Sequence, residues 1–101
     1  MSYSLVDCIE RSKLNKESFE IPDAEDIAQL KVGDHVILIF ENIGENDTIS
    51  PSGERMWVLI TEVNANKFKG TLDNYPAFIE NLKYQDVIEF EAKHICNLNH
   101  H

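Results

Sequence analysis

The feature that most constrains the fold is a pair of segments in which apolar side chains occupy both alternating sets of positions. His35 to Glu41 reads His-Val-Ile-Leu-Ile-Phe-Glu, and Met56 to Val63 puts Met56, Val58 and Ile60 on one side and Trp57 and Leu59 on the other. β-Branched and aromatic residues favour extended backbone, whose side chains alternate between two faces. The first segment is predicted to be a central strand buried on both faces, and the second a strand with two apolar faces.

A β-hairpin is predicted directly after the second segment. Asn64-Ala65-Asn66 is suited to a tight turn, because asparagine tolerates positive φ where most residues do not. The residues that follow alternate cleanly between apolar and polar, which places Phe68, Gly70 and Leu72 on the inner face of a second strand.

A last strand is predicted over residues 86–91, with Ile88 and Phe90 on its inner face. It is preceded by a weak internal repeat, since Leu30-Lys31-Val32-Gly33-Asp34-His35-Val36 is similar to Leu82-Lys83-Tyr84-Gln85-Asp86-Val87-Ile88. Each copy is interpreted as a turn that leads into a strand.

Helices are short in this chain. Residues 24–30 follow Pro22 and Asp23, carry acidic residues in their first turn and end before Gly33, which predicts a two-turn helix. Residues 3–13 fit either a helix or a short strand. The predicted fold class is α+β, mainly β: a curled antiparallel sheet or small open barrel with one or two short helices as cover.

Length and charge limit the possible functions. A chain of 101 residues that is 43% hydrophobic is expected to form a single domain over residues 1–101. Its 18 acidic and nine basic residues give a net charge of −9, which opposes binding to the phosphates of nucleic acid. The acidity either maintains solubility or serves the recognition of a basic partner.

The two cysteines and the apolar pattern suggest a cellular location. Cys8 and Cys96 are too few for a disulfide scaffold, so reduced thiols are expected. No apolar run is long enough for a signal peptide or a membrane span, so a cytoplasmic protein without membrane contact is expected. His100 and His101 are either native or the remnant of a purification tag, and no chemistry is assigned to them.

No catalytic centre is predicted. His94 and Cys96 would share one face of a strand, but two ligands do not make a zinc site, so neither metal nor another cofactor is expected and no disulfide is needed. Nucleophile-elbow and phosphate-loop motifs are absent from the sequence. An enzyme is therefore not expected.

Residues 53–98 contain a spaced pattern made of Gly53-Glu54, Met56-Trp57-Val58, Phe68-x-Gly70-x-Leu72-x-Asn74-x-Pro76, Leu82-Lys83-x-x-Asp86-x-Ile88-x-Phe90 and Ile95. In this pattern they resemble a bacterial family known as domain of unknown function 2314. The chain departs from the family pattern at Gln85, where glycine is usual, and at Asn97-Leu98, where an Asp-Trp pair is usual. The resemblance implies a bacterial origin and a shared fold, and it brings no known activity.

The candidate binding residues follow a loop predicted over residues 42–53. That loop is rich in turn formers and is expected to be exposed and mobile. It leads into Glu54, Arg55 and Trp57, and the turn at Asn74 and Tyr75 would form a rim beside them. Tryptophan is usually well buried, which favours packing of Trp57 with Phe68 in one core. The alternative is a half-exposed ring beside Arg55, a combination typical of recognition surfaces.

Two functions are compatible with these features. The first is a non-catalytic module that binds a protein or peptide, in one form an inhibitor or immunity-type protein whose acidity complements a basic partner, acting as a monomer or homodimer. The second is a small-molecule pocket or an unrecognised hydrolase inside the curled sheet. A pocket with convergent titratable groups favours the second, and a flat acidic face favours the first.

Overall fold

The computed structural model describes residues 3–14, 21–42, 53–77, 79 and 82–99. It is built mainly of strands, with two short helices, which confirms the predicted fold class. The strands are β1 (Tyr3–Leu5), β2 (His35–Asn42), β3 (Gly53–Asn64), β4 (Lys67–Leu72), β5 (Val87–Glu91) and β6 (Asn97–Asn99). The helices are α1 (Cys8–Leu14) and α2 (Ala24–Ala28), and a 3₁₀ turn, η1 (Ala92–His94), precedes β6.

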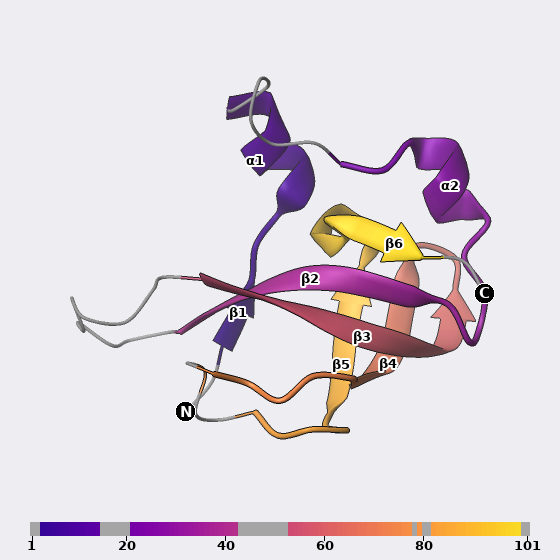
Figure 1. Ribbon diagram of the computed structural model, residues 1–101. Coiled ribbons are helices and arrows are strands. Elements are labelled where there is room, and N and C mark those ends of the chain that lie inside the picture. Colours follow the sequence, from indigo (N-terminus) through magenta and orange to yellow (C-terminus); the bar gives the residue numbers. More distant parts are fainter. Residues whose placement is uncertain (1–2, 15–20, 43–52, 78, 80–81, 100–101) are drawn as a thin grey trace.

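The strands form one antiparallel sheet that curls into a nearly closed barrel. The order is β1-β2-β3-β4-β5, and β6 pairs with β2 along the edge that β1 also uses (Figure 1). One seam stays unsealed, and it lies between the two end strands of this order. Burial, together with the negative charges of Asp86 just before β5 and Glu89 within it, raises the pKa of Tyr3 in β1, as expected for a tyrosine that faces acidic groups across the seam.

The barrel interior is the main hydrophobic core. Alternate residues of β2 and β3 point inward, and the inner faces of β4 and β5 complete the core, with Phe68 and Phe90 stacked at a ring-centroid distance of 5.3 Å. This confirms the predicted inner faces. The fully enclosed members from β2 to β5 are Val36, Leu38, Phe40, Met56, Val58, Ile60, Leu72 and Ile88.

A second, smaller apolar cluster covers the outer face of β2. It contains Val6, Ile39 and the two cysteines, with Ile21 and Ile37 packed against it. In Figure 1 both helices lie on this side of the sheet, beyond β2 and β6. The outer face of β2 is covered only in part: Ile39 is buried, whereas His35 and Ile37 are half-buried, so the predicted burial on both faces holds only around Ile39.

The expectation that the cysteines stay apart as reduced thiols is wrong. Cys8 at the start of α1 and Cys96 just before β6 form a disulfide, and both residues are buried. They come together because the segment after β1 and the segment before β6 both cross the outer face of β2. Nothing local in the sequence signals this proximity, since the two residues are 88 positions apart.

The internal repeat is the same turn built twice. Asp34 accepts a hydrogen bond from the Lys31 N–H at 3.1 Å, and Asp86 accepts one from the Lys83 N–H at 2.8 Å. The residue before each aspartate has positive φ, 100° at Gly33 and 73° at Gln85. Glycine adopts this conformation freely whereas glutamine does not, so the backbone of Gln85 is strained.

The hairpin is confirmed, but its left-handed residue differs from the expectation. Ala65 has φ of 58°, whereas the turn was predicted from its asparagines. On the next strand Gly70 is needed for close approach: a Cβ there would lie 2.6 Å from Cγ1 of Val58 and would overlap the Leu59 carbonyl. The loop predicted at 42–53, except for its ends, and His100 and His101 lie outside the described residues. Within the described ranges no helix is long and apolar enough to cross a membrane.

Candidate functional site

The candidate site lies on the outer face of β2, β3 and β4. Side chains of one strand alternate between its faces, so Trp57 points outward while its neighbours Met56 and Val58 point into the barrel. The prediction that Trp57 shares a core with Phe68 is therefore wrong: Phe68 belongs to the barrel interior, and Trp57 is half-buried on the opposite face. The alternative of a half-exposed ring describes its position.

Strand register decides what surrounds Trp57. Ile37 of β2 pairs directly with Trp57, and His35 lies one pleat further along. On the other flank the Asp73 N–H donates to the Trp57 carbonyl at 2.9 Å, just beyond the end of β4. The pairing of β6 with β2 brings Asn99 opposite His35. Four residues from four distant parts of the chain thus meet on one face.

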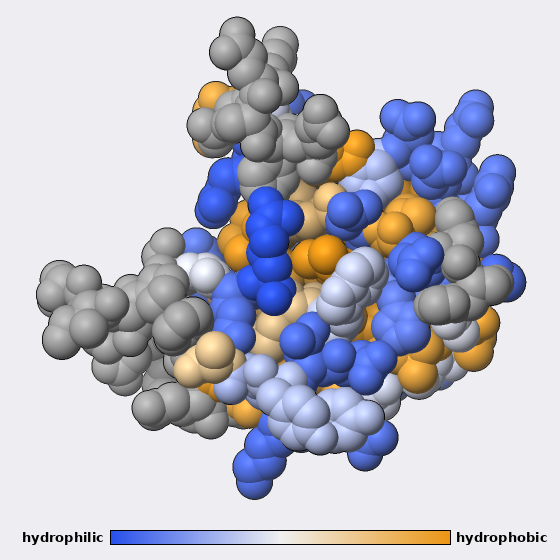
Figure 2. All heavy atoms as spheres, viewed as in Figure 1, coloured by the Kyte–Doolittle hydropathy of each residue, from blue (hydrophilic) through white to orange (hydrophobic). Residues whose placement is uncertain are grey.

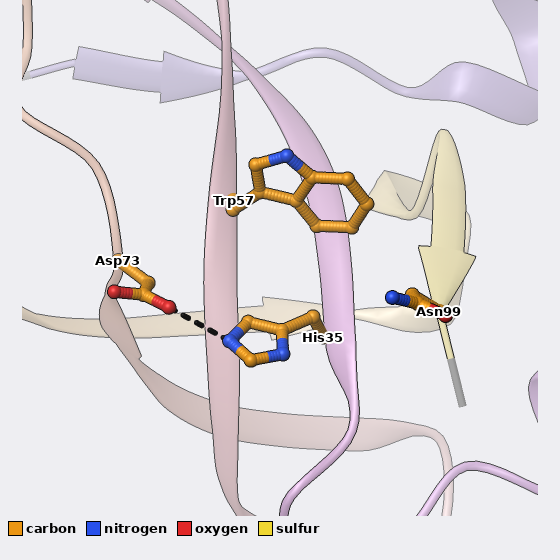
Figure 3. Close-up of a pocket in the computed structure, with 4 residues that line it drawn as sticks. All are labelled: His35, Trp57, Asp73 and Asn99. Atoms are coloured by element: carbon orange, nitrogen blue, oxygen red, sulfur yellow. Dashed lines mark hydrogen bonds and ion pairs between the residues drawn. The ribbon is translucent and has the colours of Figure 1, made fainter. Parts of the chain in front are cut away.

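These four residues line an open hollow of about 260 Å³. Figure 3 shows the Trp57 ring lying over one side, His35 and Asp73 joined on another, and the Asn99 amide facing them from β6. The Trp57 and His35 rings meet edge to face, with centroids 6.1 Å apart and planes at 89°. This arrangement gives the indole a defined orientation, because edge-to-face contact is a favoured geometry of aromatic pairs.

His35 and Asp73 form the polar pair of the hollow. Nε2 of His35 lies 2.7 Å from Oδ2 of Asp73, and their side chains are 23% and 41% exposed. In the neutral tautomer with the proton on Nε2, the ring donates this bond and the carboxylate keeps its negative charge. The pair can therefore either orient an imidazole for proton transfer or hold an anionic carboxylate in a defined position.

The turn after β4 fixes the backbone of Trp57. The side-chain oxygen of Asn74 accepts a hydrogen bond from the Trp57 N–H at 2.6 Å. Together with the bond from Asp73, this satisfies both backbone polar groups of Trp57 on the β4 side. Asn74, predicted as a binding residue, thus acts here as a support for Trp57.

Glu54 and Arg55 have different surroundings, although they are adjacent. The Glu54 carboxylate accepts hydrogen bonds from the N–H groups of Ala77 at 2.6 Å and Ile79 at 3.2 Å. It therefore holds the backbone of Ala77 and of Ile79 near β3 and lies on the opposite face from Trp57. Arg55 is exposed on the same face as Trp57, on the other side of the ring from His35.

Tyr75 is the fifth predicted binding residue. It is 78% exposed and stacks on Tyr84, with ring centroids 4.8 Å apart and planes at 18°. Neither ring lines the hollow. The structure thus brings Arg55 and Trp57 together on one face, gives Asn74 and Glu54 supporting roles, and puts Tyr75 in a separate aromatic pair.

Three residues of the hollow were missed by the sequence analysis: His35, Asp73 and Asn99. The sequence places His35 at the start of one predicted strand and Asp73 just after another, the strand that ends at Leu72. Alternation along the strands could have indicated these positions. His35 belongs to the residues of β2 that point outward, and Asp73 follows β4 at the position opposite Trp57. Using that signal requires the register of four strands, which is a long-range property.

The described residues offer no metal centre, since no group of three potential ligands gathers among them. Cys96 is bonded to Cys8, and Nδ1 of His94 accepts a hydrogen bond from the Glu91 N–H at 2.9 Å. Burial lowers the pKa of His94, and the neighbouring Lys93 adds to this shift. The suggested His94 and Cys96 ligand pair is thus engaged in other bonds.

Residues 24–99 match the model of a family described as an uncharacterized protein conserved in bacteria, DUF2314. The chain belongs to this family. The match begins well before residue 53, so α2 and β2 also belong to the shared part, whereas β1, α1 and Cys8 lie outside it. No curated protein and no solved structure is significantly similar to the chain.

Proposed function

We propose that this DUF2314 protein is a non-catalytic module that binds a protein or peptide through the outer face of β2, β3 and β4. The observation that carries the proposal is the position of Trp57: a large aromatic ring, half-buried outside the core, that borders an open hollow. A ring held in this way contributes contact area without being needed to fill the barrel.

The Trp57 ring is held in a fixed position, which lowers the entropy cost of binding. Its backbone is held by Asp73 and Asn74, and its ring packs on His35. Ordering a side chain on binding costs about 0.5–1.5 kcal/mol, and a ring already in place avoids most of that cost. Tryptophan and arginine are the residues most enriched in interface hot spots, and Arg55 lies beside Trp57 on the same face.

The partner we propose is basic, which matches an inhibitor or immunity-type role. The net charge of −9 would steer a basic protein toward the chain and raise its association rate. In Figure 2 most of the visible face is hydrophilic, with apolar side chains between the polar ones and no single broad apolar area. We propose that the free protein is a monomer or homodimer that contacts neither nucleic acid nor membrane.

Site-directed cross-linking tests the proposal. A photoreactive amino acid at Arg55 should capture a discrete partner in lysate of the native host, whereas the same group at exposed Val63, near the β3–β4 hairpin, should not. With the captured partner purified, Trp57→Ala should weaken binding by more than about tenfold, as expected of a hot spot. Equal capture from both positions, or unchanged affinity of the variant, would contradict the proposal.

A second candidate function rests on the His35–Asp73 pair. A histidine oriented by a carboxylate can act as a general base toward water, so the hollow is also suited to a small hydrolase or a small-molecule site. A panel of ester and amide substrates tests this candidate. Hydrolysis that His35→Gln and Asp73→Asn both abolish, and that Glu62→Gln leaves intact, would favour it over the binding module.

The cytoplasm is the location we propose from the sequence, and the disulfide makes that proposal testable. Disulfides persist mainly in oxidising compartments and are rare in a bacterial cytosol. Thiol labelling in rapidly quenched host cells, followed by fractionation, would show both the compartment and the state of Cys8 and Cys96. A fully oxidised pool outside the cytoplasm would refute the cytoplasmic location.

A further inference from the structure

We infer that the hollow of His35, Trp57, Asp73 and Asn99 accepts an arginine side chain of the partner. This inference rests on the proposed binding function and adds the chemistry of the group that is recognised. The lining residues supply the two elements that a guanidinium group needs, an aromatic face from Trp57 and a carboxylate from Asp73.

The carboxylate is the first recognition element. Asp73 is 41% exposed and is held by Nε2 of His35 through one oxygen, Oδ2. This contact fixes the direction of the Asp73 carboxylate, so His35 is a positioning residue for the incoming cation.

The indole is the second element. A guanidinium group is planar and weakly hydrated, so it stacks on aromatic faces more readily than an ammonium group does. Figure 3 shows the Trp57 ring with Asp73 on one side and Asn99 on the other, so one planar cation could contact the ring while donating to the Asp73 carboxylate.

Size and charge both favour a side chain over a larger ligand. The hollow holds about 260 Å³, which is below the range of about 300–1,000 Å³ typical of small-molecule pockets. Among its described lining there is no lysine or arginine, and Arg55 lies on the other side of the Trp57 ring. The overall charge of −9 also favours a cation.

The single tryptophan of the chain provides a direct assay. Because Trp57 is the only tryptophan, intrinsic fluorescence reports on this hollow alone. The probe is acetyl-Gly-Arg-Gly-amide, compared at constant ionic strength with peptides that carry lysine, citrulline, leucine or glutamate in the middle position. Citrulline has nearly the shape of arginine without its charge. The arginine peptide should give a saturable change, and the citrulline peptide should bind about five- to tenfold more weakly.

Single substitutions show whether the arginine peptide binds at this hollow. Asp73→Asn should weaken binding of the arginine peptide by about five- to tenfold, whereas Glu62→Gln, which changes the net charge equally at an exposed site, should leave it within about twofold. Asn99→Asp adds a second carboxylate to the hollow and should strengthen binding, which keeps the inference testable even if Asp73→Asn unfolds.

The outcomes separate this inference from the proposed function. Equal binding of arginine and citrulline peptides, preference for glutamate or leucine, or no change in Asn99→Asp would overturn the arginine site. If a partner is still captured through Arg55 and depends on Trp57, the binding function stands without it. If the arginine peptide binds as expected but no partner is captured, the proposed function fails and the site remains.

Discussion

Removal of the Cys8–Cys96 disulfide should destabilise the protein strongly. The bond joins residues 88 positions apart, so it closes nearly the whole chain into one loop. In the chain-entropy description, closing a loop of this length removes disorder from the unfolded chain worth about 4–5 kcal/mol. A domain of this size has a total free energy of unfolding of about 5–15 kcal/mol. The disulfide is therefore expected to contribute a large share of the free energy of unfolding.

Urea denaturation followed by far-UV circular dichroism measures this contribution. The oxidised protein, the protein with reductant and the double variant Cys8→Ala, Cys96→Ala should be compared at one pH. The reduced protein and the double variant should both lose about 4–5 kcal/mol, and reductant should have no further effect on the double variant. That last comparison is the control for unspecific effects of the reductant.

A loss below about 1 kcal/mol would refute the reasoning. It would mean that the ends of the unfolded chain are already constrained, or that the small cluster around Ile39 holds the N-terminal segment without the covalent bond. Hydrogen exchange then separates the two explanations. In the second case, the backbone of α1 would stay protected in the reduced protein.

Four further predictions concern single positions. Trp57→Ala should cost about 1–2 kcal/mol in urea denaturation, against about 3–5 for Phe90→Ala in the core, and equal losses would contradict the outward position of the indole. Gly70→Ala should lower the melting temperature, because its Cβ would overlap β3. Gln85→Gly should add about 0.5–1 kcal/mol in the same assay by relieving positive φ, and a loss would show that the glutamine side chain is needed. Because burial lowers the pKa of His94, the unfolded chain takes up this proton at higher pH, so the melting temperature should fall as the pH drops through about 6.5, and less so in His94→Gln.

The sheet could be predicted from the sequence because its signals are local. Alternation within β4 and β5 identifies their inner faces without knowledge of any partner strand, and the two apolar sets of β3 identify it as a strand. The segment at 3–13 was ambiguous because it contains both structures that were considered, β1 followed by α1. The disulfide escaped prediction because cysteine spacing along the chain carries no information about proximity across a sheet.

Only part of the candidate site could be predicted, because its composition depends on which residues meet across the sheet. The position of Trp57 depends on which of two apolar faces of β3 points into the barrel, and both sets of residues would suit a core. The side chains of Met56, Val58 and Ile60 point into the barrel interior, so the larger indole of Trp57 lies on the outer face. His35, Asp73 and Asn99 join it only through long-range register, which no local pattern reveals.

The placement of β1 has a consequence for assembly. β1 lies outside the family-matched range and pairs with residues 40–42, the end of β2 that β6 does not reach. Without β1, the N–H and C=O groups along that edge would be unpaired beside Phe40, and such an edge is a template for adding strands from other chains. A chain trimmed to the family-matched range would have to cover this edge with another segment or with a second copy of itself. Because β1 pairs with this edge, it is expected to protect the chain against aggregation through strand addition.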